Sequence, residues 1–140
     1  NIPIWATEFD VADPNEFKRA DELEKFYRTA FSHPSVEGVV LWDFWAGSAS
    51  RDPNRALMDV DGRINAAGQR YLDLRTEWTT NISTTAATGG VYNFRGFHGD
   101  YNVTITLADG TRINRTMSLD AGNPTSTLSV RSRWSIAGAS

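Results

Sequence analysis

Two acidic residues stand at the end of an apolar segment, where carboxylates could do chemistry. Glu8 interrupts the nearly unbroken apolar run Ile2–Phe9, and Asp10 follows two positions later, on the same face if the segment is a strand. An ionised carboxylate is costly to bury without a partner. We therefore interpret Glu8 as a candidate catalytic residue and Asp10 as its hydrogen-bonding supporter. The alternative is that Glu8 is a structural carboxylate bonded to a neighbouring element.

A second group of residues combines an acid with two tryptophans. Trp42 and Trp45 flank Asp43 at the end of the apolar run Val36–Phe44. The flat face of an indole suits the C–H groups of a sugar ring, so both tryptophans are candidate sugar-binding residues. Tryptophan is more often a core residue, and this stays the alternative for each of them.

The other residue types argue against several further chemistries. The chain has two separated histidines, His33 and His98, and no cysteine, and no carboxylates stand at metal-ligand spacing beside them. We therefore expect no metal site and no cofactor. The sequence contains neither a phosphate-binding glycine loop nor a recognisable Ser-His-Asp arrangement.

A strand–helix–strand unit would position the acidic residues. The run Ile2–Phe9 is typical of a strand buried on both faces. A helix should follow, with Asp13 as its cap and Pro14 as its first residue, and should end near His33-Pro34. The run Val36–Phe44 is the second strand, and the helical crossover predicts that the two strands are parallel.

Apolar spacing predicts which helix faces are buried. Charged side chains such as Arg19 should face water, while one apolar stripe faces the core. A second helix is expected after Asp61-Gly62, and we also place Trp5 in the core. The stripes consist of Phe17, Ala20, Leu23, Tyr27, Ala30 and Phe31 in the first helix, and of Ala67, Tyr71, Leu74 and Trp78 in the second.

The composition changes after the second helix. Residues 1–80 form a first domain, and residues 81–90, rich in Thr, Ala and Gly, are a linker. Short alternating segments predict a small antiparallel, sandwich-like β domain over residues 91–131, followed by a tail at 132–140 that contains Trp134. The predicted strands are Val91–His98, Tyr101–Leu107, Arg112–Leu119 and Ser126–Val130.

Charge and hydropathy exclude two classes of partner. The 140 residues carry a net charge of -3, with a pI near 5.3, so the chain offers no broad basic surface for phosphate backbones or anionic lipids. The longest apolar runs are far below the roughly 18 residues of a membrane span. We expect neither nucleic acid nor a membrane as a partner.

Three N-glycosylation sequons favour a secretory route. They begin at Asn81, Asn102 and Asn114, whereas Asn123-Pro124-Thr125 is excluded by its proline. A single sequon is often incidental, but three within a short stretch favour an extracellular, secreted glycoprotein.

Two parallel strands with two helices do not make a complete domain. They cannot close a barrel, and they leave strand edges and apolar faces uncovered. The chain also opens at Asn1 without an initiator methionine. We therefore expect residues 1–78 to belong to something larger, built from upstream sequence or from a companion chain.

Four segments of the sequence occur in an order and spacing typical of one protein family. They are Ile4–Asp10, Phe31–Gly38, Leu41–Trp45 and Ile64–Gly68. Together they resemble the end of family 10 glycoside hydrolases, the xylanase family, and residues 91–119 resemble the small β domain that follows the barrel in plant and invertebrate members. The resemblance implies an α/β fold in which residues 2–9 and 37–44 are strands seven and eight of a (β/α)₈ TIM barrel.

The resemblance also implies a reaction. Glu8 would be the nucleophile that attacks a β-1,4-linked polysaccharide with retention of configuration, and Trp42 and Trp45 would line the cleft. Retaining sites hold two carboxyl groups about 5 Å apart. In the family the second is a glutamate on strand four, which these 140 residues do not contain, so the chain alone is expected to be inert.

Two departures from the family pattern leave alternatives open. Asp43 stands where members often carry glycine, and residues 47–51 contain no tryptophan where members often have one. One alternative is therefore a non-catalytic, carbohydrate-binding or structural glycoprotein on a degenerate xylanase scaffold. Another makes the β domain a binding or docking module. Its candidate aromatic residues are Tyr92, Phe94, Phe97 and Tyr101.

Overall fold

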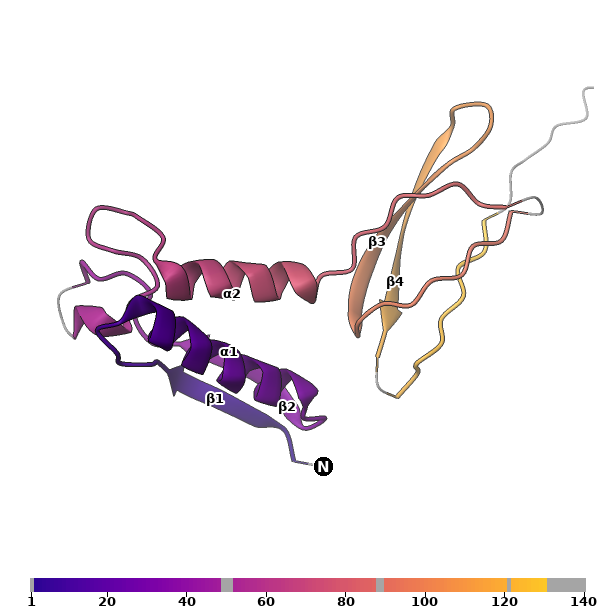
Figure 1. Ribbon diagram of the computed structural model, residues 1–140. Coiled ribbons are helices and arrows are strands. Elements are labelled where there is room, and N and C mark those ends of the chain that lie inside the picture. Colours follow the sequence, from indigo (N-terminus) through magenta and orange to yellow (C-terminus); the bar gives the residue numbers. More distant parts are fainter. Residues whose placement is uncertain (1, 49–51, 88–89, 121, 131–140) are drawn as a thin grey trace, which may run out of the picture. The chain divides into compact units, whose positions relative to one another are not determined.

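The chain divides after Thr79 into two units. The computed structural model describes residues 2–48, 52–87, 90–120 and 122–130 (Figure 1). Trp134 and the predicted tail at 132–140 lie outside the described residues. Within the described ranges, no helix has the length and apolar character that a membrane crossing requires.

The first unit is built on a parallel pair of strands. Strand β1 (Ile4–Phe9) is followed by helix α1 (Glu16–Ser32) and strand β2 (Val36–Leu41). The strands pair in parallel, with Trp5 opposite Gly38, which confirms the predicted strand–helix–strand unit. A short 3₁₀ helix, η1 (Pro53–Arg55), and helix α2 (Ala66–Glu77) complete this unit. The mixture of helices and strands, with small sheets, is consistent with part of an α/β fold.

The cap of helix α1 differs from the prediction. The N-cap is Asn15, whose side chain accepts hydrogen bonds from the amides of Phe17 and Lys18. Asp13 instead accepts a hydrogen bond from the Asn15 amide at 2.8 Å, so the helix starts two residues later than expected. Both residue types are good caps, and local spacing alone did not decide between them. The predicted end of the helix at His33 is confirmed.

The core lies where the two helices meet the loop before α2. Ala20, Leu23, Leu57, Ala67 and Leu74 form its buried cluster. Phe17 and Phe31 do not join it, although the stripe predicted that they would: they are 68% and 49% exposed.

Arg19 and Trp5 correct two further predictions. Arg19 does not face water but is 4% exposed, because its guanidinium donates to the carbonyl oxygens of Asp13 and Asn54. Trp5 is not a core residue but is 56% exposed, and its ring lies over Gly38 at the sheet surface. A Cβ atom on Gly38 would come within 2.4 Å of that ring, so a larger residue at this position would have to displace the indole.

The second unit contains an antiparallel hairpin. Strands β3 (Gly99–Thr106) and β4 (Arg112–Leu119) pair along their whole length, with Tyr101 opposite Met117. The turn between them includes Gly110, whose φ of 84° requires the left-handed backbone that glycine adopts easily.

Two of the four predicted strands in this unit were wrong. Neither Val91–His98 nor Ser126–Val130 forms a strand in the described part of the chain. The first segment is held by side chains instead of a ladder: the Tyr101 hydroxyl donates to the Phe97 carbonyl, and the Phe97 amide donates to the Thr80 hydroxyl at 3.2 Å. Alternating burial in Ser126–Val130 is present, but this pattern reports burial of side chains and does not require ladder bonds.

One buried side chain fastens the loop before α2 to the rest of the first unit. Asn65 is 1% exposed and caps α2 by accepting from the amides of Ala67 and Gly68, both at 3.1 Å. Its amide nitrogen donates to the carbonyl of Ala56 at 2.9 Å. The loop approaches the helix so closely that a Cβ atom on Gly68 would come within 2.2 Å of the Leu57 carbonyl oxygen.

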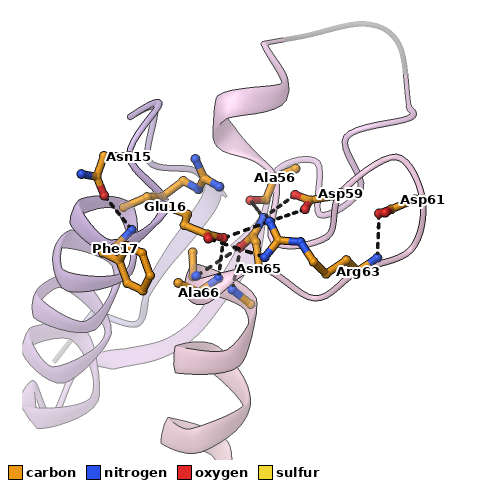
Figure 2. A network of polar contacts seen from close by, with 12 residues as sticks. Asn15, Glu16, Phe17, Ala56, Asp59, Asp61, Arg63, Asn65 and Ala66 are labelled. Atoms are coloured by element: carbon orange, nitrogen blue, oxygen red, sulfur yellow. Dashed lines mark hydrogen bonds and ion pairs between the residues drawn. The ribbon is translucent and has the colours of Figure 1, made fainter.

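Glu16 reinforces the same junction from helix α1. Its carboxylate accepts from the Ala66 amide at 3.0 Å and from Arg63 at 3.2 Å, as Figure 2 shows. Arg63 also forms an ion pair with Asp59 in the loop. The bond from the Ala66 amide, followed by the one from Arg63, lowers the pKa of the Glu16 carboxyl below its ordinary value of 4.5.

Replacing Asn65 by alanine should strongly destabilise the protein. The variant loses a helix cap and leaves buried backbone groups without partners, which should lower the free energy of unfolding by about 2 to 4 kcal/mol. Urea denaturation followed by circular dichroism measures this. Asn15→Ala, which removes the exposed cap of α1, is the matched control and should cost about 1 kcal/mol. Equal effects of the two substitutions would contradict the role assigned to Asn65.

The Glu16 contacts should make stability depend on pH. Because its pKa is lower in the folded state, Glu16 stabilises the fold above pH 4.5, and this contribution is lost as the pH falls through the lowered pKa. Glu16→Gln should therefore be less stable than the unchanged protein at pH 7, with the difference shrinking by pH 3. Urea midpoints at both values test this, with Glu22→Gln, at the exposed pair with Lys25, as the control.

Candidate functional site

The two parallel strands end at one edge of their sheet. The backbone amide of Trp42, the residue that follows β2, donates to the carbonyl of Phe9 at the end of β1, at 2.9 Å. We call residues 8–10 and 42–45 the carboxyl edge. The structure thus brings to one edge the residues that the sequence singled out. They are Glu8, Asp10, Trp42, Asp43 and Trp45.

Glu8 is exposed at this edge. It lies one residue before the end of β1, and its carboxylate makes neither a hydrogen bond nor an ion pair with the described residues. No described residue ties this carboxylate to a neighbouring element, and both interpretations of Glu8, catalytic and structural, stay predictions. An exposed, unpaired carboxylate next to an aromatic residue is available to a ligand.

Asp10 is hydrogen-bonded, and its partner was not foreseen. Nη1 of Arg55 donates to both carboxylate oxygens of Asp10, at 2.7 and 2.8 Å. The hydrogen bond to Asp10 raises the pKa of Arg55 above its already high ordinary value. The two residues are 45 positions apart, so no local spacing could have revealed the pair. The available signal was a basic residue in the loop that follows the second acidic strand end.

Asp43 and Trp45 shape the turn after β2. Asp43 has a φ of 57°, in the left-handed region, and its carboxylate accepts from the Ser48 hydroxyl at 3.1 Å. Trp45 is 39% exposed, and its ring lies over Gly47, where a Cβ atom would come within 2.3 Å. Trp42 is half-buried. Residues 49–51, part of the loop where the family resemblance leads one to look for a tryptophan, lie outside the described residues.

A polar cleft of about 380 Å³ lies close to the loop junction, away from Glu8. Its charged groups already have partners: Glu16 and Asp59 pair with Arg63, and Arg19 donates to backbone carbonyls. Glu8 is not among the residues that line it. Across the described residues, no group of three or more His, Asp or Glu side chains is placed to hold a metal ion.

All three sequon asparagines are exposed in the second unit. In the hairpin, Asn102 stands opposite Thr116 and Asn114 opposite Thr104, so each asparagine faces the hydroxyl residue of the other sequon. The Thr104 hydroxyl donates to the Asn114 side-chain oxygen at 2.9 Å. Exposure of Asn81, Asn102 and Asn114 is compatible with glycosylation, which stays a prediction.

Comparison with known proteins relates the chain to parts of much longer proteins. No protein-family model matches the chain. It is 43% identical over 125 residues to the anti-sigma-I factor RsgI6 of Acetivibrio thermocellus, which covers 89% of this chain and 16% of that protein. It is 40% identical over 122 residues to endo-1,4-beta-xylanase 2 of Arabidopsis thaliana, and 38% identical over 128 residues to endo-1,4-beta-xylanase 3 of the same plant.

These matches cover most of the chain but little of the relatives. The two xylanase matches span 87% and 91% of the chain, and 11% and 17% of the relatives' own lengths. The chain is therefore a xylanase-related sequence that corresponds to a short portion of proteins with that name.

Proposed function

We propose that the chain forms part of a retaining endo-β-1,4-xylanase or a related β-glycanase, with Glu8 as the nucleophile. The observation that carries this proposal is the exposed, unpaired Glu8 at the carboxyl end of a parallel strand pair. In barrels of parallel strands, active sites lie at that end. Similarity to xylanase-named proteins over about nine-tenths of the chain supports a β-1,4-linked polysaccharide as the substrate.

The proposed reaction has two steps. A carboxylate oxygen of Glu8 attacks the anomeric carbon, and the glycosidic C–O bond breaks as the leaving oxygen takes a proton from a general acid. Water, deprotonated by the same group, then cleaves the glycosyl ester and restores the Glu8 carboxylate with net retention. The second carboxyl group must lie about 5 Å from Glu8 and come from outside these 140 residues. The chain by itself should therefore not hydrolyse polysaccharide.

The exposed apolar side chains of the first unit support a larger barrel around this strand pair. Ile4, Trp5 and Val40 are strand residues with 47%, 56% and 45% of their surface exposed. Further strands, from upstream sequence or a companion chain, would cover them, with residues 1–80 as the last two strand–helix units.

The second unit completes the proposed organisation. Residues 91–131 would be the small β domain, joined by a linker at 81–90 and followed by a tail at 132–140. The exposed sequon asparagines support a secreted glycoprotein. Trp42 and Trp45 would contact the sugar rings of a substrate bound at the carboxyl edge. Their indoles are half-buried and exposed, respectively, so a ring face is available for this contact.

Replacing Glu8 by glutamine should abolish hydrolysis. In the full natural protein that contains this chain, Glu8→Gln should lower the release of reducing sugar from xylan by more than about 1,000-fold, because an amide is a poor nucleophile. Glu37→Gln is the matched control, since Glu37 is exposed on β2 of the same sheet and accepts a hydrogen bond from Trp5. A Glu8→Gln variant as active as the Glu37→Gln variant would contradict the proposal.

A second candidate function is carbohydrate binding without turnover. It is favoured by the acid Asp43 in the turn after β2, and it is compatible with a relative whose name, anti-sigma-I factor, is not that of a hydrolase. The second unit offers a binding surface for it. Tyr92 and Phe94 are 47% and 38% exposed, with rings 13° from parallel.

The two exposed rings make this second function testable. Tyr92→Ala should reduce retention of the full protein on insoluble xylan several-fold if the second unit binds sugar, because an exposed ring can stack on a sugar. Tyr92→Phe is the control, since it keeps the exposed ring and removes only the hydroxyl. Unchanged retention in Tyr92→Ala would remove the basis for this binding surface. Retention without release of reducing sugar would favour it over the hydrolase.

A further inference from the structure

The Asp10–Arg55 ion pair is placed where it can affect Glu8. Asp10 directly follows β1, two positions after Glu8. The side chains of Asp10 and Arg55 are 17% and 32% exposed, so water and salt screen this pair less than a fully exposed one. One guanidinium nitrogen contacts both oxygens of Asp10, which restrains the position of that carboxylate. Its positive charge also offsets a second negative charge close to Glu8 in the chain.

The backbone on both sides of Arg55 is anchored to the scaffold. On one side, the carbonyl of Asn54 accepts from the buried Arg19 at 2.8 Å and from the Asp13 amide at 3.2 Å. On the other side, the carbonyl of Ala56, a buried residue, accepts from Asn65. Arg55 therefore reaches Asp10 from a fixed position, and the pair connects the end of β1 to the rigid loop before α2.

We propose that Arg55 is a positioning residue for the Glu8 nucleophile and acts through Asp10. The ion pair holds the segment after β1 in one conformation, so that the Glu8 carboxylate keeps the orientation needed for attack. It also balances the charge of Asp10, so that Glu8 is the carboxylate that remains open to the substrate. This inference rests on the proposed hydrolytic function. It concerns a residue that does not itself touch the substrate.

The test compares substitutions in the full natural protein. Arg55→Gln should lower kcat on xylan by about 10- to 100-fold while KM changes by less than about 3-fold, because misplacement of a nucleophile affects the transition state more than binding. Arg55→Lys, which keeps the charge, should recover part of the loss. Adding Asp10→Asn to Arg55→Gln should cause little further loss of kcat, since both changes break the same contact.

Arg28→Gln is the matched control for general effects on stability. Arg28 makes two 2.8 Å hydrogen bonds to Glu77 between α1 and α2, and neither residue belongs to the carboxyl edge. Its loss should change the thermal midpoint but leave kcat within about 2-fold of the unchanged protein. Thermal unfolding of each variant shows whether the Arg55 variants are folded, and the recovery in Arg55→Lys guards against misfolding as the cause.

Two failures can be told apart. If Glu8→Gln is inactive but Arg55→Gln keeps the kcat of the unchanged protein, the positioning role is overturned and the hydrolytic function stands. If Glu8→Gln keeps full activity, the hydrolytic function fails and the role of Arg55 fails with it. A fall in kcat for Arg55→Gln that the Asp10→Asn variant does not share would also overturn the proposal, because the effect would not pass through Asp10.

Discussion

The first unit depends on the buried side chain of Asn65. A loop without regular structure carries backbone donors and acceptors that must find partners once water is excluded. Asn65 satisfies two amides at the start of α2 and one carbonyl in the loop, and Glu16 satisfies a third amide from the neighbouring helix. These bonds join the loop, α1 and α2 into one body. The apolar cluster around Leu23 and Leu57 then packs against a loop whose course is already determined.

The junction between the loop, α1 and α2 also holds the carboxyl edge in place. At this end Phe9 pairs with Leu41, and the Trp42 amide adds a bond from the residue after β2 to the end of β1. Arg55 directly precedes the buried residue Ala56, so the core holds Arg55 in place. Arg55 in turn holds Asp10 through their ion pair. The candidate nucleophile thus sits on a rigid support although part of its surroundings is solvent. This arrangement suits a site in which other strands supply the opposite wall.

The sequence predicted those features that depend on periodicity or local order. Strands β1 and β2, the helix between them and its end at His33 followed from apolar runs and turn residues, and the carboxylate and tryptophans at the strand ends followed from the same runs. The cap of α1 was missed because two suitable residues stand two positions apart. Burial of Arg19 and the partner of Asp10 were missed because each depends on contacts 35 to 45 residues away.

The second unit shows a different limit of sequence patterns. Alternation of apolar and polar residues correctly indicated which side chains of residues 126–130 are shielded, but it does not specify whether a neighbouring strand supplies ladder bonds. In residues 91–98 the hydroxyls of Tyr101 and Thr80 provide partners for the backbone instead. Strand pairing depends on residues distant in sequence, so the pattern of a short segment does not determine whether it pairs.

At the Asp43 turn, the charge of the carboxyl edge can change without a change in its backbone conformation. The backbone there is left-handed, a conformation that glycine adopts freely and that aspartate tolerates better than most residues. An exchange between these two residues therefore preserves the path of the turn while it adds or removes one negative charge. A single substitution at this position can in this way change the electrostatic potential over the carboxyl edge while the course of the backbone stays the same.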